Sequence, residues 1–219
     1  MSLEEELAAQ RRRAWEARGP EELKARARAI EDVDAAGVAG VALTMGDSIP
    51  RFTLPDASGR PVRIADLIES GPVVISFYRG GWCPYCNLEL RALQGRLAEL
   101  RDLGAMLVAI SPELPDRSLS TVERNKLTFP VLSDLGNRVA REFRLVHLVA
   151  PEVVAYQLGN NNDVAAFNGA EVAEVPLPAT YVVDRAGRVE YAFVSADYTR
   201  RSDPDDVLAA VRKLNTDHA

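Results

Sequence analysis

The only two cysteines of the chain, Cys83 and Cys86, are three residues apart, which is close to one turn of an α-helix. Side chains at this spacing on a helix are neighbours and can form a disulfide with modest adjustment. The apolar run 73–78 before them predicts a buried strand, and leucines at helical spacing follow them. A Cys-x-x-Cys pair at a strand-to-helix junction is typical of redox-active thiols. The sequence therefore predicts thiol-based oxidoreductase chemistry.

The residues around the pair favour a reactive thiolate. Pro84 suits the first position of a helix, which makes Cys83 the expected N-cap. A sulfur at this position can accept backbone N–H groups and faces the positive end of the helix dipole, so its thiolate is favoured. The leucine stripe of the helix includes Cys86, so we expect Cys86 to be buried and Cys83 to be more exposed. Trp82 offers an apolar wall, and Arg79 adds positive charge.

Other interpretations of the cysteine pair are weaker. A structural zinc site needs four ligands, and His147 and His218 are not spaced like a zinc motif. We therefore expect no metal and no cofactor. A purely structural disulfide here would close a very small loop and would contribute little chain entropy. Two buried cysteines without a redox role remain an alternative.

Composition narrows the class of protein. A net charge of −6 argues against nucleic acid or an anionic membrane as the main partner. The acidic start of the chain is unlike a secretory signal, and no apolar run approaches the length of a membrane span. We therefore expect a cytoplasmic protein, in whose reducing surroundings a cysteine pair is more often reactive than structural.

The elements that position the pair follow from periodicity. Residues 1–45 predict a helical extension with helices at 2–18 and 20–35, whose narrow apolar stripes need the same domain or a second copy, as in a homodimer, to pack on. From residue 46 the pattern changes to strands and turns that alternate with helices. Strands are predicted at 52–54, 62–64, 73–78, 106–110, 129–132, 181–184 and 189–194, and helices at 64–69, 84–103, 116–126, 136–143 and 203–214. This order predicts an α/β fold with a mixed sheet and an antiparallel edge.

Three motifs in this order resemble the alkyl hydroperoxide reductase/thiol-specific antioxidant family, the peroxiredoxins. They are Gly46-Asp47-x-x-Pro50-x-Phe52-Thr53-Leu54-Pro55-Asp56, Phe129-Pro130-Val131-Leu132-Ser133-Asp134 and Tyr181-Val182-Val183-Asp184-Arg185-x-Gly187. The resemblance spans about 46–214 and implies a thioredoxin fold. It implies one thioredoxin-like domain over 46–219 with an insertion at about 147–175.

The resemblance also assigns expected roles, with departures. The peroxidatic cysteine of the family falls on Cys86, and Glu89 fits the family pattern. Cys83 and Arg79 occupy the positions of the family's threonine and proline, and Pro178 that of its distal arginine, so peroxide-orienting groups are missing. Pro178 instead resembles the cis-proline of thioredoxins, and Cys-Pro-Tyr-Cys is the glutaredoxin tetrapeptide.

Three functions follow as hypotheses. The first is a thiol-dependent antioxidant peroxidase, in which a Cys83–Cys86 disulfide forms and is reduced by an external thiol such as thioredoxin, glutaredoxin or glutathione. The second is a thiol–disulfide oxidoreductase, in which Cys83 attacks a partner disulfide. The third is a non-catalytic redox sensor or scaffold. The resemblance favours the first, and the missing peroxide-orienting residues favour the second.

The remaining polar segments are expected to be structural. His147 lies between two apolar residues and is expected to be packed or on the surface, with a role as a base the less favoured alternative. Residues 198–201 are expected to form a solvated turn, with a basic rim as the alternative. Residues 160–163 are expected to form a loop within the insertion, with a substrate lid as the less favoured alternative.

Overall fold

The structure is a computed structural model that describes residues 1–216, so His218 lies outside the described residues. Its centre is a sheet of five strands: β3 (Val73–Phe77), β4 (Met106–Ser111), β5 (Val131–Ser133), β8 (Ala179–Val183) and β9 (Val189–Val194). The strand order is β5-β4-β3-β8-β9. The strands β3, β4 and β5 are parallel, whereas β8 and β9 pair antiparallel with their neighbours. The predicted α/β sheet with an antiparallel edge is confirmed.

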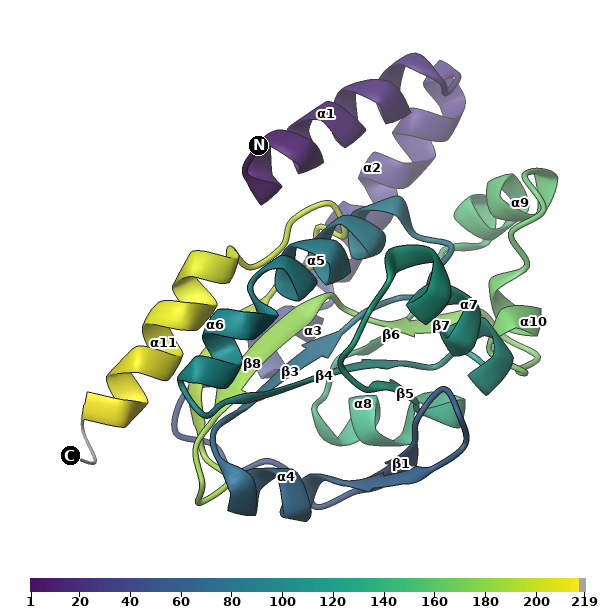
Figure 1. The fold of residues 1–219 in the computed structure, drawn as a ribbon. Helices are drawn as coiled ribbons and strands as arrows, with labels where there is room; N and C mark the ends of the chain where they lie inside the picture. Colours follow the sequence, from purple (N-terminus) through teal and green to yellow (C-terminus); the bar gives the residue numbers. More distant parts are fainter. Residues whose placement is uncertain (217–219) are drawn as a thin grey trace.

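Helices cover both faces of this sheet (Figure 1). One face is covered by α5 (Pro84–Gly95), α6 (Leu97–Asp102) and α11 (Pro204–Thr216). The other face is covered by α4 (Ile64–Ser70) and α8 (Arg138–Glu142), which follows the short 3-10 helix η1 (Leu135–Asn137). The predicted hairpin is present as β1 (Thr53–Pro55) and β2 (Pro61–Arg63), and α7 (Pro115–Asn125) lies against β5.

The central strand β3 supplies both halves of the core, because successive side chains of a strand point to opposite faces of the sheet. Val74 belongs to the apolar cluster under α5, α6 and α11. Val73, Ile75 and Phe77 belong to the cluster on the other face. This strand is buried along its whole length and ends directly before the turn that leads to the cysteines.

The N-terminal extension forms α1 (Leu3–Glu16), α2 (Pro20–Ala35) and the short α3 (Val38–Val41), so the predicted helices at 2–18 and 20–35 are confirmed. α1 begins with a capping box made by Ser2 and Glu5. It packs along α5, with Leu3 and Leu7 in the same apolar cluster as the cysteines, and α2 packs against α9 (Pro151–Gly159). The extension therefore lies against the part of the chain that holds the cysteine pair (Figure 1).

The single helix predicted at 84–103 is wrong, because the structure divides it into α5 and α6. Arg96 leaves the helical backbone region at φ −106° and ψ 6°, directly after Gly95, which is a weak helix former. Ion pairs of Arg96 with Glu99 and Asp205 hold this bend against the start of α11.

The predicted insertion has its own elements, β6 (Val146–Leu148), α9, α10 (Val164–Phe167) and β7 (Glu174–Pro176), with β6 and β7 paired antiparallel. They enclose a third apolar cluster, which includes Val149, Val153 and Val175. Ala29 of α2 and Trp82 both pack against this third cluster. Across residues 1–216, none of the helices combines the length and the apolar character that a membrane crossing requires.

Candidate redox site

The cysteine pair begins helix α5 at the carboxyl end of β3. Cys83 is the N-cap and Pro84 the first helical residue, as predicted, although the Cys83 side chain makes no capping hydrogen bond. The first backbone bond of the helix runs from the N–H of Asn87 to the carbonyl of Cys83 at 3.1 Å. Both cysteines are free thiols.

The expectation that Cys83 is exposed is wrong. Its exposed fraction is 1%, and that of Cys86 is 0%. The leucines of α1 lie in the same apolar cluster, and the ring of Tyr85 meets that of Tyr198 at a centroid distance of 5.8 Å. Arg11 of α1 donates to the carbonyl of Thr199 at 3.4 Å and so joins this helix to the segment 195–203. The N-terminal extension and this segment together cover the start of α5.

The glycines before the cysteines allow a close approach of the chain to its neighbours. Gly80 has φ +145°, and a Cβ there would overlap the Trp82 indole. A Cβ on Gly81 would overlap the hydroxyl of Thr121 in α7. The N–H of Gly81 donates to the carboxylate of Glu113 at 2.8 Å. The turn therefore places the cysteines beside a buried carboxyl group that follows β4.

The Cys86 side of the pair contains a buried ion pair. Arg201 donates from Nη2 to Cys86 Sγ at 3.0 Å, and its Nε lies 2.7 Å from Glu89 Oε2 in a fully buried ion pair. Thr180 Oγ1 of β8 donates to the other carboxylate oxygen of Glu89 at 3.0 Å. The predicted solvated turn at 198–201 is therefore wrong, because Arg201 points inward and neutralises the buried Glu89.

On the Cys83 side, a buried arginine lies against aromatic rings. Arg79 is 4% exposed, and its guanidinium lies over the rings of Trp82 and Tyr198, 4.8 Å and 4.5 Å from their centroids. Its buried Nε has no hydrogen-bond partner. No carboxylate among residues 1–216 forms an ion pair with this arginine, and two ring faces lie against its guanidinium.

The two sulfurs are driven to opposite protonation states. Burial opposes the ionisation of Cys83, but its hydrogen bond with Cys86 and the charges of Arg79 and Arg201 hold its pKa well below the ordinary value. Burial, the same hydrogen bond and the negative charge on Cys83 raise the pKa of Cys86 well above the ordinary value. At neutral pH the arrangement therefore favours a Cys83 thiolate beside a Cys86 thiol.

Two buried carboxyl groups flank the pair. Burial raises the pKa of Glu89 to about 7, although Arg201 and Thr180 work in the opposite direction. Burial also raises the pKa of Glu113 to about 7, against the hydrogen bond from Gly81 and the charges of Arg117 and Arg124. Either group can hold or release a proton near neutral pH.

The structure also tests the expectations for Pro178 and His147. The proposed cis-proline at Pro178 is wrong, because no peptide bond among residues 1–216 is cis. Pro178 is buried and its carbonyl accepts from the N–H of Ser195 at 3.2 Å, which fixes it as the residue that precedes β8. His147 is half-buried in β6, in line with the expected packed position. Within the described part of the chain, no group of three or more His, Cys, Asp or Glu residues could hold a metal ion.

Sequence reasoning missed Arg201, Thr180 and Glu113. Arg201 meets Cys86 across 115 positions of sequence, and no periodicity marks it. A signal for Glu113 was available, because it lies two residues beyond the end of β4, a parallel strand next to β3. In α/β sheets, functional groups gather beyond the carboxyl ends of such strands.

Comparisons with known proteins identify a family and similar folds. Residues 45–192 match the AhpC/TSA family. A peroxiredoxin of Mycobacterium tuberculosis is 37% identical over 97 residues, which cover 44% of this chain and 61% of the relative. Peroxiredoxin Bcp of Escherichia coli is 31% identical over 101 residues, which cover 46% of this chain and 64% of the relative. The chain thus spans about three-fifths of the length of the curated relatives it matches.

Solved structures are also similar. The crystal structure of peroxidoxin BcpB from Mycobacterium tuberculosis superposes with a TM-score of 0.61 at 25% identity, over 78% of this chain and 98% of that chain. A cysteine variant of peroxiredoxin 6 from Arenicola marina superposes with a TM-score of 0.65 at 13% identity, over 80% of this chain and 75% of that chain. The fold is therefore the thioredoxin fold that the sequence resemblance implied.

Proposed function

The chain belongs to the AhpC/TSA family, and from that membership we propose that it is a thiol-dependent peroxidase that works through Cys83 and Cys86. The observation that carries the proposal is the pair of buried sulfurs with opposite protonation preferences beside two buried guanidinium groups. One sulfur is poised as a nucleophile and the other as a proton-bearing partner.

The resemblance to the family puts the peroxidatic position on Cys86, but we propose Cys83 as the attacking sulfur, because its pKa is lowered and that of Cys86 is raised. In the first step, the Cys83 thiolate attacks the outer oxygen of a peroxide. A sulfur–oxygen bond forms, the oxygen–oxygen bond breaks, and the leaving alkoxide or hydroxide takes up a proton. Glu113 is a suitable proton source, because its pKa of about 7 leaves it partly protonated at neutral pH and it contacts the neighbouring Gly81. The product on the enzyme is a Cys83 sulfenic acid.

In the second step, Cys86 attacks the Cys83 sulfenic acid. A Cys83–Cys86 disulfide forms and water leaves. Once Cys83 has lost its negative charge, that charge no longer opposes the ionisation of Cys86. The hydrogen bond from Arg201 then favours the Cys86 thiolate. Arg201 and Glu89 thus act as positioning residues for the resolving sulfur.

In the third step, an external thiol reduces the disulfide, because two thiols supply the two electrons that the dithiol state requires. We propose a thiol such as thioredoxin, glutaredoxin or glutathione as the donor, in a reducing compartment such as the cytoplasm. The cover over α5 must open for a protein donor to reach the pair, since both sulfurs are buried.

The thiol–disulfide oxidoreductase is the less favoured function. A protein disulfide needs an accessible attacking sulfur, and Cys83 is covered. The trans bond before Pro178 also removes the likeness to the thioredoxin groove. A peroxide is small, whereas a protein disulfide, like a protein donor, can reach the sulfurs only after the cover over α5 has opened.

One experiment separates the two functions. Stopped-flow oxidation of the reduced protein by peroxide and reduction of insulin disulfides are measured on the same preparation. We expect rapid oxidation by peroxide that is lost in Cys83→Ser, and insulin reduction no faster than the dithiothreitol control. Fast insulin reduction without peroxide consumption would contradict the proposal.

A further inference from the structure

Four exposed cations gather beside the redox turn, where α7 lies against α5 (Figure 1). They are Arg91 of α5, Arg117 and Arg124 of α7, and Lys126, the C-cap of α7, and together they form what we call the basic patch. Among residues 1–216, none of the four forms an ion pair with a carboxylate. The net charge of the chain is −6, so the local field of the basic patch is opposite in sign to that of the whole molecule.

The carboxylates of α7 do not neutralise the basic patch. Arg117 and Arg124 are seven positions apart, which is close to two helical turns, so they share one side of the helix. Asp116 and Glu123 are also seven positions apart, but each lies about 100° around the helix axis from an arginine. The helix therefore separates its positive side from its negative side.

Hydrogen bonds join the basic patch to the turn that holds Cys83. Arg124 Nη1 donates to the carbonyl of Gly81 at 3.1 Å. Asn87 Nδ2 donates to the same carbonyl at 2.8 Å and to the carbonyl of Cys83 at 3.0 Å. These bonds hold the backbone on either side of Trp82.

Arg91 is connected to the same turn through two asparagines. Its Nη1 donates to Asn125 Oδ1 at 2.8 Å, and Asn125 Nδ2 donates to Asn87 Oδ1 at 2.7 Å. A carboxylate is a stronger acceptor for a guanidinium than a neutral amide oxygen. A carboxylate that approaches Arg91 or Arg124 therefore competes with their present acceptors and loosens the turn.

The spacing of the basic patch fits an extended acidic surface better than a single small anion. A small anion is held by groups that converge on it, whereas Arg91 and Arg124 are held by different acceptors. Arg117 lies over the ring of Phe167, 4.2 Å from its centroid. Two helical turns, about 10 Å, separate Arg117 from Arg124 along the helix. Carboxylates spread over the surface of a protein or peptide match such a row of cations.

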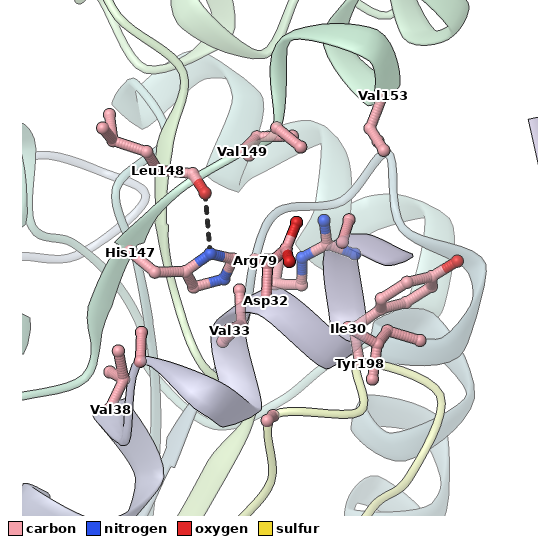
Figure 2. A pocket seen from close by; sticks show the side chains of 14 residues that line it. Ile30, Asp32, Val33, Val38, Arg79, His147, Leu148, Val149, Val153 and Tyr198 are labelled. Carbon is pink, nitrogen blue, oxygen red and sulfur yellow. Dashed lines mark hydrogen bonds between the residues drawn. The ribbon is translucent and has the colours of Figure 1, made fainter. Parts of the chain in front are cut away.

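The α2 side of the turn has a different charge pattern. A cavity of about 280 Å³ lies there beside Arg79, and its walls are mostly apolar side chains of α2 and of the segment around α9 (Figure 2). Its lining holds the carboxylate of Asp32, and it includes neither cysteine and no residue of the basic patch. An acidic partner is therefore drawn to the α7 side of the turn rather than to the α2 side.

We propose that the basic patch is the docking surface for the protein thiol that reduces the Cys83–Cys86 disulfide, and that this donor carries carboxylates beside its own cysteine pair. The inference rests on the proposed peroxidase function, which leaves a disulfide that an external thiol must reduce. Docked carboxylates draw Arg91 and Arg124 from their present acceptors, and the turn loosens. This supplies the opening that two buried sulfurs require.

Reduction then takes two exchanges. A donor thiolate attacks Cys83 Sγ, a mixed disulfide with the donor forms, and Cys86 leaves as a thiolate beside Arg201. The second donor thiolate attacks the donor sulfur of the mixed disulfide, and Cys83 leaves as a thiolate. The donor ends as a disulfide, and two electrons have passed to the pair. Of the two protons that the donor thiols release, one protonates Cys86 and the other passes to solvent.

Binding is tested first, without electron transfer. Two peptides with a Ser-x-x-Ser core, one flanked by glutamates and one by lysines, are titrated into the disulfide form of Trp15→Phe protein, in which Trp82 is the only tryptophan. We expect the glutamate peptide to change the Trp82 fluorescence saturably and to bind about tenfold more tightly than the lysine peptide at low salt. The net charge of the chain alone predicts the reverse order.

Reduction is then compared as a ratio of rates. The same two peptides, now with a Cys-x-x-Cys core, reduce the peroxide-oxidised protein, and uncharged dithiothreitol is the reference. We expect the glutamate peptide to react about tenfold faster than the lysine peptide at low salt, and the ratio to approach unity in molar salt. In the double variant Arg91→Gln with Lys126→Gln, the ratio should fall about fivefold or more.

The matched control is the double variant Arg185→Gln with Lys213→Gln, which removes the same two charges at exposed positions. Arg185 follows β8 at the end that pairs with the start of β3, and the last turn of α11 contacts the carbonyl of Leu103 through Asn215. Both positions therefore lie toward the amino end of β3, away from the cysteines. We expect the ratio of rates in this control to equal that of the wild type.

Lys126→Glu, a single exposed change, should also lower the ratio and repeats the test if the double variant folds poorly. Equal ratios in the patch and control variants, or a lysine peptide as fast as the glutamate peptide at low salt, would overturn this inference and leave the peroxidase function standing. Stronger competition by single-stranded DNA than by polyglutamate would assign the basic patch to nucleic acid and would also overturn it. Failure of peroxide to form the disulfide would overturn the proposed function itself.

Discussion

Two buried arginines flank the cysteine pair, and their surroundings differ. Arg201 on the Cys86 side forms an ion pair with Glu89 and donates a hydrogen bond to Cys86 Sγ. Arg79 on the Cys83 side has aromatic neighbours and an unpartnered Nε, and it borders a cavity. The comparison indicates that the contacts of Arg201 fix the position of the Cys86 sulfur, whereas Arg79 on the Cys83 side leaves room for a bound molecule.

The largest expected effect comes from breaking the paired side. Arg201→Met leaves Glu89 buried without its counter-charge, so the free energy of unfolding of the reduced protein should fall by about 3–5 kcal/mol. Urea denaturation at pH 7.5 under dithiothreitol measures this loss.

The double variant Glu89→Gln with Arg201→Met is the control, because glutamine still accepts from Thr180 and carries no charge. We expect it to regain most of the lost stability. An equal loss in the single and double variants would show that the ion pair does not explain the burial of Arg201.

The next effect concerns Glu113, whose pKa of about 7 in the folded protein lies above its ordinary value of 4.5. Between these two values the folded state keeps a proton that the unfolded state has lost. The free energy of unfolding therefore falls as pH rises through this window. Glu113→Gln keeps an acceptor for the N–H of Gly81 but has no carboxyl group to titrate. Over the same pH window, the free energy of unfolding of this variant should fall by roughly 2–3 kcal/mol less than that of the wild type.

Denaturation curves at pH 5 and pH 8 for the wild type and Glu113→Gln measure this difference. Glu123→Gln, at an exposed position of α7, serves as a control for the loss of one carboxyl group. The same pH dependence in all three proteins would contradict the assignment of a raised pKa to Glu113.

The smallest effect on stability is expected for Arg79→Met, because no carboxylate is left unpaired and only the cation–π contacts are lost, a change of about 1 kcal/mol. The pKa of Cys83 should rise, since the charge of Arg79 lowers it. The pH dependence of iodoacetamide alkylation in a Cys86→Ser background measures this pKa. An unchanged profile, equal to that of the exposed control Arg12→Met, would show that Arg79 does not act on the sulfur.

Features of the site that depend on neighbouring residues were predictable from the sequence, and contacts between distant residues were less so. The strand β3, the N-cap at Cys83 and the start of α5 follow from short-range periodicity and from Pro84, so they are predicted correctly. The groups around the cysteines come from distant positions, with Arg201 beyond β9 and Glu113 beyond β4. The position of Glu113 after a parallel strand is a signal for it, whereas no local pattern reveals Arg201.

The burial of Cys83 was also beyond local reasoning. Its position at the tip of a helix predicts exposure, but Leu3 and Leu7 of α1 lie in the same apolar cluster as Cys83, and Tyr198 packs on Tyr85 nearby. The narrow apolar stripe of α1 predicted that this helix needs a surface, although the stripe does not identify which surface. Likewise, the apolar residues of the insertion pack against Ala29 of α2 and against Trp82, which are distant in sequence.

The central claim is that Cys83, and not Cys86, is the sulfur that meets peroxide. Each cysteine is changed to serine separately, the reduced variants are treated with one equivalent of peroxide in the presence of dimedone, and the adducts are located by mass spectrometry. We predict a dimedone adduct on Cys83 in Cys86→Ser and none on Cys86 in Cys83→Ser, because only Cys83 is held as a thiolate. An adduct on Cys86 in Cys83→Ser, with none on Cys83 in Cys86→Ser, would contradict the account.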